Sequence, residues 1–214
     1  MKKENTKKIL LIVDVQNDFV TPTGSLYVKN SETLPEKIAS IMNKFNEVVF
    51  TMDWHPWNHM SFKDEGGQWP RHCVAYSSGS AIPDVLLKAE CGKSPLFLAK
   101  GAKETKEEYG AFDNLWNNRD FEVYLFQFFP KISDKIDVYV CGVAGDYCVA
   151  NTVKGLKNAM YNDWFCKLNE ENEFIQKIND VYLIKDLCPC IDESYDLEAF
   201  CKEHGVITIT SNKL

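Results

Sequence analysis

The sequence predicts a single-domain α/β protein with three layers, α/β/α, around a six-stranded and mostly parallel sheet. Short, continuous apolar runs rich in Val, Ile and Leu alternate along the chain with segments of helical periodicity. This alternation is typical of strands that are buried on both faces and joined by crossover helices. The length of 214 residues, of which 45% are hydrophobic, is sufficient for one sizeable core.

Six segments fit the strand pattern, and each is bounded by polar residues or by glycine. Each run is continuous, without alternation of polar and apolar side chains, so helices should cover both faces of the sheet. Strands linked by a helix pair in parallel, which makes a parallel sheet the expected arrangement. In chain order the predicted strands are Ile9–Val13, Val48–Thr51, Leu96–Ala99, Val138–Cys141, Val181–Ile184 and Val206–Ile209.

Three of the intervening segments carry the periodicity of amphipathic helices. The first is Leu34–Asn46, and the second runs from Phe121 to Ile132 with apolar residues at i, i+3, i+4, i+7, i+8 and i+11. The third runs from Val149 to Met160. Each apolar stripe predicts a helix that packs one face against the sheet.

The composition excludes several classes of protein. With 24 basic and 31 acidic residues, and a net charge of −7, the chain lacks the basic face that nucleic-acid binding requires. No apolar run approaches the ~20 residues of a membrane span, and the basic start lacks the features of a signal peptide. Eight cysteines without a C-x-x-C pair do not predict a disulfide scaffold or a zinc ribbon.

We expect one domain over residues 1–214, with surface insertions near residues 77–95 and 161–180. We further expect a cytoplasmic homo-oligomer with no nucleic-acid and no membrane partner.

Reactive or ligating side chains follow four of the predicted strands. Asp14 follows the first strand, Asp53 with His55 the second, Lys100 the third and Cys148 the fourth. Because the carboxyl ends of parallel strands share one edge, where ligands bind, we expect these side chains to converge. Taken singly, each has an ordinary interpretation as a strand end, a helix cap or a core residue. Their convergence is what indicates a functional site.

Cys148 is predicted in the first turn of a helix, after a glycine-containing turn. Unpaired N–H groups and the positive end of the helix dipole favour a thiolate there, and the same donors can hold an oxyanion. Asp14 would act beside it as a general base, with Lys100 holding that carboxylate ionised. The alternative is that Cys148 is a small core residue, as we expect for Cys141.

A second group of side chains has the composition of a metal site. Asp53 and His55 are two residues apart in an extended chain and therefore point the same way. With His59 and His72, three of the four histidines lie between positions 55 and 72. Two imidazoles and a carboxylate, with open positions for water or substrate, are typical of a divalent-metal site. Scattered surface histidines are the alternative.

Five sequence blocks contain the residues discussed above, together with their neighbours. The blocks are Asp14–Phe19, Asp53–Pro56 with Asn58, His59, Ser61 and Phe62, Trp69–Val74, Lys100 and Gly101 with Tyr109–Phe112, and Gly142–Val149. In these blocks the chain resembles the nicotinamidases of the isochorismatase-like cysteine hydrolases. The blocks occur in family order between residue 9 and about residue 160, and the D-W-H-P and W-P-x-H-C patterns are the most specific part of the resemblance.

The resemblance implies the isochorismatase-like hydrolase fold and a metal-dependent amidase. Its reaction would be the hydrolysis of nicotinamide to nicotinate and ammonia through a cysteine thioester, in NAD salvage. One alternative is a related cysteine amidase that acts on another small amide or on a ureido substrate, which would not need the metal residues. Another is a non-catalytic metal or thiol sensor.

The resemblance also implies roles for individual residues. Cys148 would be the nucleophile, Asp14 the proton acceptor and donor, and Lys100 the third catalytic residue. Asp53, His55 and His72 would hold one divalent ion, with Zn²⁺ expected and Fe²⁺ or Mn²⁺ as alternatives.

The implied substrate pocket is aromatic. Phe19, Trp69 and Tyr109 would line it, and the backbone N–H groups of Ala144 and Cys148 would form an oxyanion hole behind a cis peptide. The fourth metal position stays open between His59, Glu65 and water. Gly145 departs from the family pattern, which has Thr there.

Overall fold

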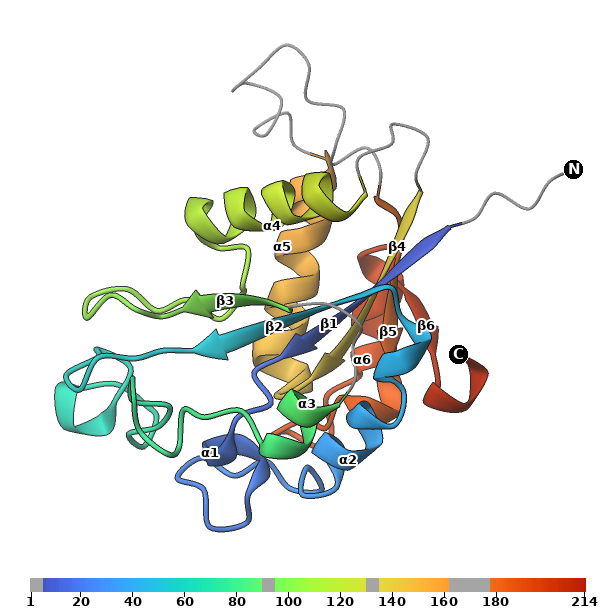
Figure 1. Ribbon diagram of the computed structural model, residues 1–214. Helices are drawn as coiled ribbons and strands as arrows, with labels where there is room; N and C mark the ends of the chain where they lie inside the picture. Colours follow the sequence, from blue (N-terminus) through green and yellow to red (C-terminus); the bar gives the residue numbers. More distant parts are fainter. Residues whose placement is uncertain (1–5, 90–94, 130–134, 162–177) are drawn as a thin grey trace, which may run out of the picture.

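The computed structural model describes residues 6–89, 95–129, 135–161 and 178–214. Figure 1 shows a central sheet with helices on both sides, which is the three-layer α/β/α arrangement predicted from the sequence. None of the helices in these described ranges combines the length and the apolar character that a bilayer span requires.

One six-stranded sheet contains all the predicted strands. Its order is β3-β2-β1-β4-β5-β6, and all five pairings are parallel. The central strands β1 and β4 are almost wholly buried, as their continuous apolar runs predict. The bounds are β1 Lys7–Val13, β2 Glu47–Asp53, β3 Leu96–Lys100, β4 Ile136–Gly142, β5 Ile178–Ile184 and β6 Ile207–Ile209.

Helices connect the strands in the expected alternation. The α-helices are α1 Asn17–Val20, α2 Leu34–Ala39, α3 Asp84–Lys88, α4 Leu115–Phe128, α5 Ala150–Tyr161 and α6 Leu197–Glu203. A π-helical turn, Gly145–Val149, leads into α5, and short 3₁₀ turns are formed by Met42–Lys44, Lys63–Glu65, Lys185–Leu187 and Ser211–Lys213.

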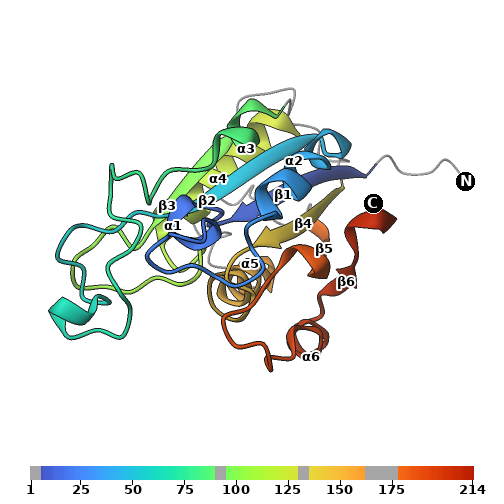
Figure 2. The same cartoon turned by 90° about the horizontal axis from the view of Figure 1, so that it is seen from below.

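The helices form two layers. In the view from below, α2 and α3 lie on one side of the sheet and α5 and α6 on the other (Figure 2). Helix α4 belongs to the layer of α5, because a small cavity is lined by Phe121 of α4 and by Leu156 of α5. Lys157 of α5 donates to the carbonyl of Gly205 at 3.1 Å, which ties α5 to the turn after α6.

The first predicted helix is shorter than its apolar pattern. Helix α2 ends at Ala39, and a 3₁₀ turn follows, although the pattern continues to Asn46. The Ser40 hydroxyl donates to the Lys37 carbonyl at 2.7 Å, so it competes with the helical hydrogen bonds at that point. Ile41 and Phe45 are nevertheless buried in the core.

The two stretches predicted as surface insertions differ in outcome. The stretch at 77–95 contains α3, and its Ile82 and Leu86 are buried in the core, so it is only partly a surface segment. In the stretch at 161–180, residues 162–177 lie outside the described residues, and Ile178 already begins β5.

The strand order reverses beside β1. Strands β2 and β3 extend the sheet on one side of β1, while β4, β5 and β6 extend it on the other. The crevice at the carboxyl ends of β1 and β4 is therefore the topological switch point, where ligands bind in open α/β sheets. The predicted site residues follow the strands that meet there.

Candidate active site and metal centre

Four buried side chains converge at the carboxyl ends of four adjacent strands. Asp14 follows β1, Asp53 ends β2 and Lys100 ends β3. Asp53 and Lys100 are neighbours in register on these two adjacent strands. Cys148 lies in the π-helical turn after β4. Each of the four is at most 7% exposed. The convergence predicted from the strand ends is confirmed.

Lys100 joins the thiol to both carboxylates. Its Nζ lies 2.8 Å from Asp14 Oδ2 and 3.5 Å from Cys148 Sγ, and it donates to Asp53 Oδ1. The second oxygen of Asp14 accepts a hydrogen bond of 2.6 Å from the Thr51 hydroxyl. The ammonium group is therefore a common partner of the candidate nucleophile, the candidate base and a candidate metal ligand.

Two opposing effects set the pKa values in this cluster: burial disfavours the charged form of each group, whereas a neighbouring opposite charge favours it. Burial lowers the pKa of Lys100, but Asp14 and Asp53 outweigh it and hold that pKa well above its usual range, so the lysine is protonated. Burial raises the pKa of Asp53, and Lys100 together with His55 reverses this, so the pKa of Asp53 lies below its usual value.

For Asp14 and Cys148, the effect of burial on the pKa exceeds the opposing effect of the nearby positive charge. Burial raises the pKa of Asp14 and that of the Cys148 thiol, and the nearby Lys100 charge offsets the rise only in part. A carboxylate with a raised pKa is a stronger base than an exposed aspartate. The pair is thus suited to moving one proton between carboxylate and sulfur.

The second cluster has the donor set of a divalent-metal site. Asp53 Oδ2 lies 3.6 Å from His55 Nε2 and 3.8 Å from His72 Nε2. The Nδ1 atoms of the two rings lie 2.9 Å from the Gly101 carbonyl oxygen and 2.8 Å from that of Pro70. Since a carbonyl only accepts, both Nδ1 atoms carry a hydrogen, and the Nε2 atom of each ring faces the carboxylate. This arrangement fits a divalent ion.

His59 and Glu65 have other partners. His59 Nε2 donates to the Lys106 carbonyl at 3.0 Å, and its Nδ1 pairs with the Ser61 hydroxyl at 2.7 Å, so both ring nitrogens are engaged. Glu65 pairs with Arg71 at 3.5 Å. The three ligating atoms of Asp53, His55 and His72 therefore form the candidate metal set without either residue.

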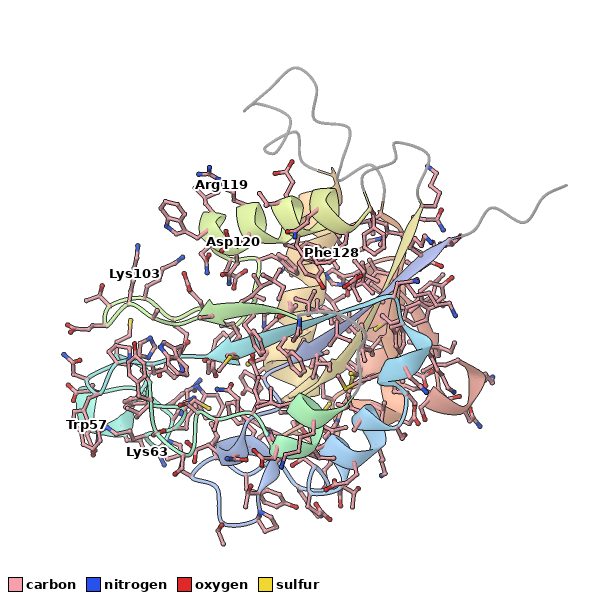
Figure 3. The ribbon with its side chains drawn as sticks, viewed as in Figure 1. Trp57, Lys63, Lys103, Arg119, Asp120 and Phe128 are labelled. Carbon is pink, nitrogen blue, oxygen red and sulfur yellow. The ribbon has the colours of Figure 1, made fainter. Side chains whose placement is uncertain are left out.

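The segment after β2, which carries these histidines, and the segment after β3 both extend beyond the ends of their strands. Figure 3 labels Trp57 and Lys63 on the first segment and Lys103 on the second, at the same end of the molecule. A backbone hydrogen bond of 2.8 Å from Met60 to Glu104 joins the two segments. Together they form the wall of the site on the β2–β3 side.

The turn that carries Cys148 contains the expected cis peptide, between Val143 and Ala144. The Gly145 N–H donates to the Pro189 carbonyl at 2.8 Å, and the Asp146 carboxylate accepts from the N–H groups of Ile191 and Asp192. The loop after β5 therefore holds this turn from behind. No site residue was expected in that part of the chain.

Aromatic side chains flank the thiol and the metal set. Trp69 Nε1 donates to the Tyr109 hydroxyl at 3.1 Å, and the Tyr147 ring lies 5.1 Å from Trp69 and 5.6 Å from Tyr109 between ring centroids. Phe19 packs instead against His72, with ring centroids 5.5 Å apart. Of the predicted pocket residues, the structure groups Trp69 with Tyr109 and places Phe19 at the metal set.

Most of the chain matches one known protein family. The Isochorismatase domain model matches residues 8–200 of the chain. The chain belongs to the isochorismatase family. The match includes all the strand ends that form the site, so the fold expected from the sequence resemblance is confirmed.

Relatives within the isochorismatase family cover most of this chain. The nicotinamidase of Saccharomyces cerevisiae is 31% identical in an alignment of 208 positions that covers 81% of this chain and 94% of the yeast protein. PnC1 of L. infantum, solved in complex with nicotinate, superposes with a TM-score of 0.76 and 29% identity over 97% of this chain and 94% of its own. A pyrazinamidase of Pyrococcus horikoshii, solved in complex with zinc, has a TM-score of 0.71 and 28% identity, covering 95% of this chain and 99% of its own.

Two further residues of this isochorismatase-family site were not singled out from the sequence. Gln16 clamps the backbone of Asp53, because its side chain accepts from the Asp53 N–H and donates to the Asp53 carbonyl, both at 2.8 Å. Tyr147 packs against Trp69 and Tyr109, and these three side chains form the aromatic group of the site. The available signals were a polar residue inside an apolar strand-end motif for Gln16 and the position directly before Cys148 for Tyr147.

Proposed function

We propose that this isochorismatase-family protein is a nicotinamidase, which hydrolyses nicotinamide to nicotinate and ammonia in NAD salvage. The observation that carries the proposal is the contact of Lys100 with Asp14, Cys148 and Asp53, since it joins a thiol–carboxylate pair to a metal set in one buried cluster. The yeast nicotinamidase and the nicotinate complex of the L. infantum protein support this substrate.

The first half of the reaction transfers the acyl group to sulfur. Asp14 takes the Cys148 proton while the sulfur attacks the carboxamide carbon, and the Lys100 ammonium stabilises the developing negative charge on sulfur. The N–H groups of Ala144 and Cys148 hold the oxyanion that forms from the carbonyl. The carbon–nitrogen bond then breaks, and Asp14 returns its proton to the departing ammonia. A thioester remains.

The second half of the reaction returns the enzyme to its resting state. Asp14, again a carboxylate, takes a proton from water as the water oxygen attacks the thioester carbon. The carbon–sulfur bond breaks, nicotinate leaves, and the Cys148 sulfur recovers the proton held by Asp14. One water molecule is consumed in each turnover.

The metal set and the aromatic group position the ring. Asp53, His55 and His72 would hold a divalent ion, which would supply a Lewis-acidic contact for the pyridine nitrogen. We propose Zn²⁺ for this ion, which the zinc complex of the P. horikoshii pyrazinamidase supports. Trp69 and Tyr109 present flat apolar faces to a flat ring at little entropic cost. Their hydrogen bond to each other fixes both rings.

The proposal is tested by ammonia release from nicotinamide. Purified protein is compared with Cys148→Ala and with a chelated, metal-stripped sample. We expect the substitution to lower kcat by roughly 10⁴-fold or more, because the nucleophile is lost, and zinc to restore the stripped sample. Appreciable turnover by Cys148→Ala would remove Cys148 from this role.

A substrate panel separates the remaining alternatives. If the zinc-loaded protein leaves nicotinamide intact but releases ammonia from another small amide or a ureido compound, the protein is a related amidase. Stoichiometric thiol titration without turnover of any amide would instead indicate a sensor. Either result contradicts the proposed activity.

A further inference from the structure

Glu108 lies on the loop between β3 and α4, directly before Tyr109. It is 7% exposed. Its Oε2 accepts from the Gly101 N–H at 3.0 Å and from Asn114 Nδ2 at 3.2 Å, and its Oε1 accepts from Lys106 Nζ at 2.7 Å. A nearly buried carboxylate with three donors is a fixed element of the loop rather than a surface group.

The Gly101 residue links this carboxylate to the metal set. Its N–H donates to Glu108, and its carbonyl accepts from His55 Nδ1 at 2.9 Å. Gly101 has φ +65°, and a Cβ there would lie 2.4 Å from the His55 ring, so the residue fits only as glycine and only in this orientation. It also directly follows Lys100.

We propose that Glu108 is a positioning residue for the metal centre. By holding the Gly101 N–H, it fixes the carbonyl that accepts from His55 Nδ1, which keeps the hydrogen on Nδ1 and the Nε2 lone pair directed at Asp53. Hydrogen-bond partners of this kind set the tautomer and orientation of metal-binding histidines, and their loss typically weakens metal binding about 10- to 100-fold.

The inference rests on the metal site proposed above, and zinc affinity tests it. The dissociation constant of Zn²⁺ is measured by competition with a chromophoric chelator for the wild type and for Glu108→Gln, Glu108→Asp and Glu108→Ala. The glutamine keeps an oxygen within reach of Gly101 but removes the charge. The aspartate keeps the charge but is one methylene shorter and loses the reach.

The order of the affinities separates positioning from charge. Positioning predicts that Glu108→Gln binds zinc within about threefold of the wild type, while Glu108→Asp and Glu108→Ala bind about 10- to 100-fold more weakly. A purely electrostatic effect predicts the opposite order for glutamine and aspartate, and would overturn the proposal. Glu104→Gln, on the exposed part of the same loop, is the matched control and should bind zinc as the wild type does.

A second measurement does not depend on zinc. In the metal-free protein, ¹⁵N NMR of the histidine rings reports which nitrogen of His55 carries the hydrogen. Burial lowers the pKa of His55, but Asp53 outweighs it and raises that pKa, so the spectra are recorded at a pH high enough for the ring to be neutral. We expect the Nδ1–H form in the wild type and Glu108→Gln, and a mixture of tautomers in Glu108→Asp, with circular dichroism confirming the fold of each variant. An unchanged tautomer in Glu108→Asp would refute the role of Glu108. A wild type that binds no zinc would instead refute the metal site itself.

Discussion

Lys100 shows at the scale of one residue how this site maintains a buried charge. Isolated in a protein interior, an ammonium group loses its proton, because burial disfavours the charged form. Asp14 and Asp53 reverse that effect, and they hold the pKa of Lys100 well above its usual range. The same positive charge lowers the pKa of the Cys148 thiol, against the effect of burial. Removal of Lys100 would therefore leave two carboxylates facing each other in the core.

The raised pKa of Asp14 predicts the acid limb of the activity profile. As a base, Asp14 acts only when ionised, so kcat/KM should fall about tenfold per pH unit once the pH drops below its pKa. Because burial raises that pKa above the usual 3.8, the limb should begin at a higher pH than for an exposed aspartate. The measurement is kcat/KM against pH, with circular dichroism at each pH to exclude unfolding. A profile flat down to pH 3.8 would contradict the role of Asp14 as base.

His55 and His204 give a matched pair for the metal assignment. His55→Ala removes one of three ligands, so zinc binding should weaken by more than the roughly 10- to 100-fold typical of losing a supporting hydrogen bond. His204 stacks on Phe200 with ring centroids 4.2 Å apart, outside the site, and His204→Ala should keep the metal. Zinc content after dialysis is the measurement. Full occupancy in His55→Ala would disprove the ligand assignment.

At the scale of elements, the turn that carries Cys148 depends on the loop that follows the neighbouring strand, β5. Gly145 donates to Pro189, and Asp146 accepts from two N–H groups of the same loop, at 3.0 and 2.8 Å. A Cβ on Gly145 would lie 2.6 Å from Cys190 Sγ and 2.8 Å from the Cys188 carbonyl oxygen. The loop thus fills the space that a larger side chain at position 145 would need.

Gly145→Ala is expected to displace this turn. The overpacked contact should lower the free energy of unfolding by about 1–3 kcal/mol, and kcat should fall because the Cys148 thiol moves with the turn. Adding Cys190→Ala should restore part of both losses, since it removes one of the two clashes and leaves the Cys188 carbonyl. Urea unfolding and steady-state kinetics are the measurements. Unchanged stability and kcat in Gly145→Ala would contradict this prediction, because they would show that the loop moves to accommodate the methyl group without cost.

At the scale of the whole molecule, the site belongs to both halves of the sheet. Strands β2 and β3 supply Asp53 and Lys100, β4 leads to Cys148, and β1 between them leads to Asp14. Because the metal set is assembled from the end of β2 and from His72 in the following segment, it forms only in the folded chain. Ligands that bind only the folded state stabilise it.

Zinc removal should therefore lower the thermal stability. At a free zinc concentration 1,000 times the dissociation constant, binding stabilises the folded state by about 4 kcal/mol, so chelation should lower the Tm measurably. His72→Ala removes a ligand and should abolish the difference between the loaded and stripped samples. Calorimetry at fixed protein concentration makes the comparison. Equal Tm values for loaded and stripped wild type would contradict a zinc site in the folded protein.

The sequence by itself determined the fold and which polar side chains stand at the ends of the strands. Buried parallel strands need continuous apolar runs, and these are visible locally, so each strand end was predicted to within two residues. The aspartate after β1, the lysine at the end of β3 and the Asp53–His55 spacing were all readable in this way. The family motifs added the roles, which remain predictions.

Only the tertiary structure decided how these residues are held. The Glu108–Gly101–His55 chain, the Gln16 clamp on Asp53 and the loop behind Gly145 all act through backbone N–H and carbonyl groups. Every residue offers such groups, so no pattern in the sequence marks the ones that are used. Helix α2 ends early for a similar reason, because a serine hydroxyl bonds a carbonyl of its own turn. The sequence states which side chains are present, whereas the hydrogen-bond partners of backbone groups are set only when the chain has folded.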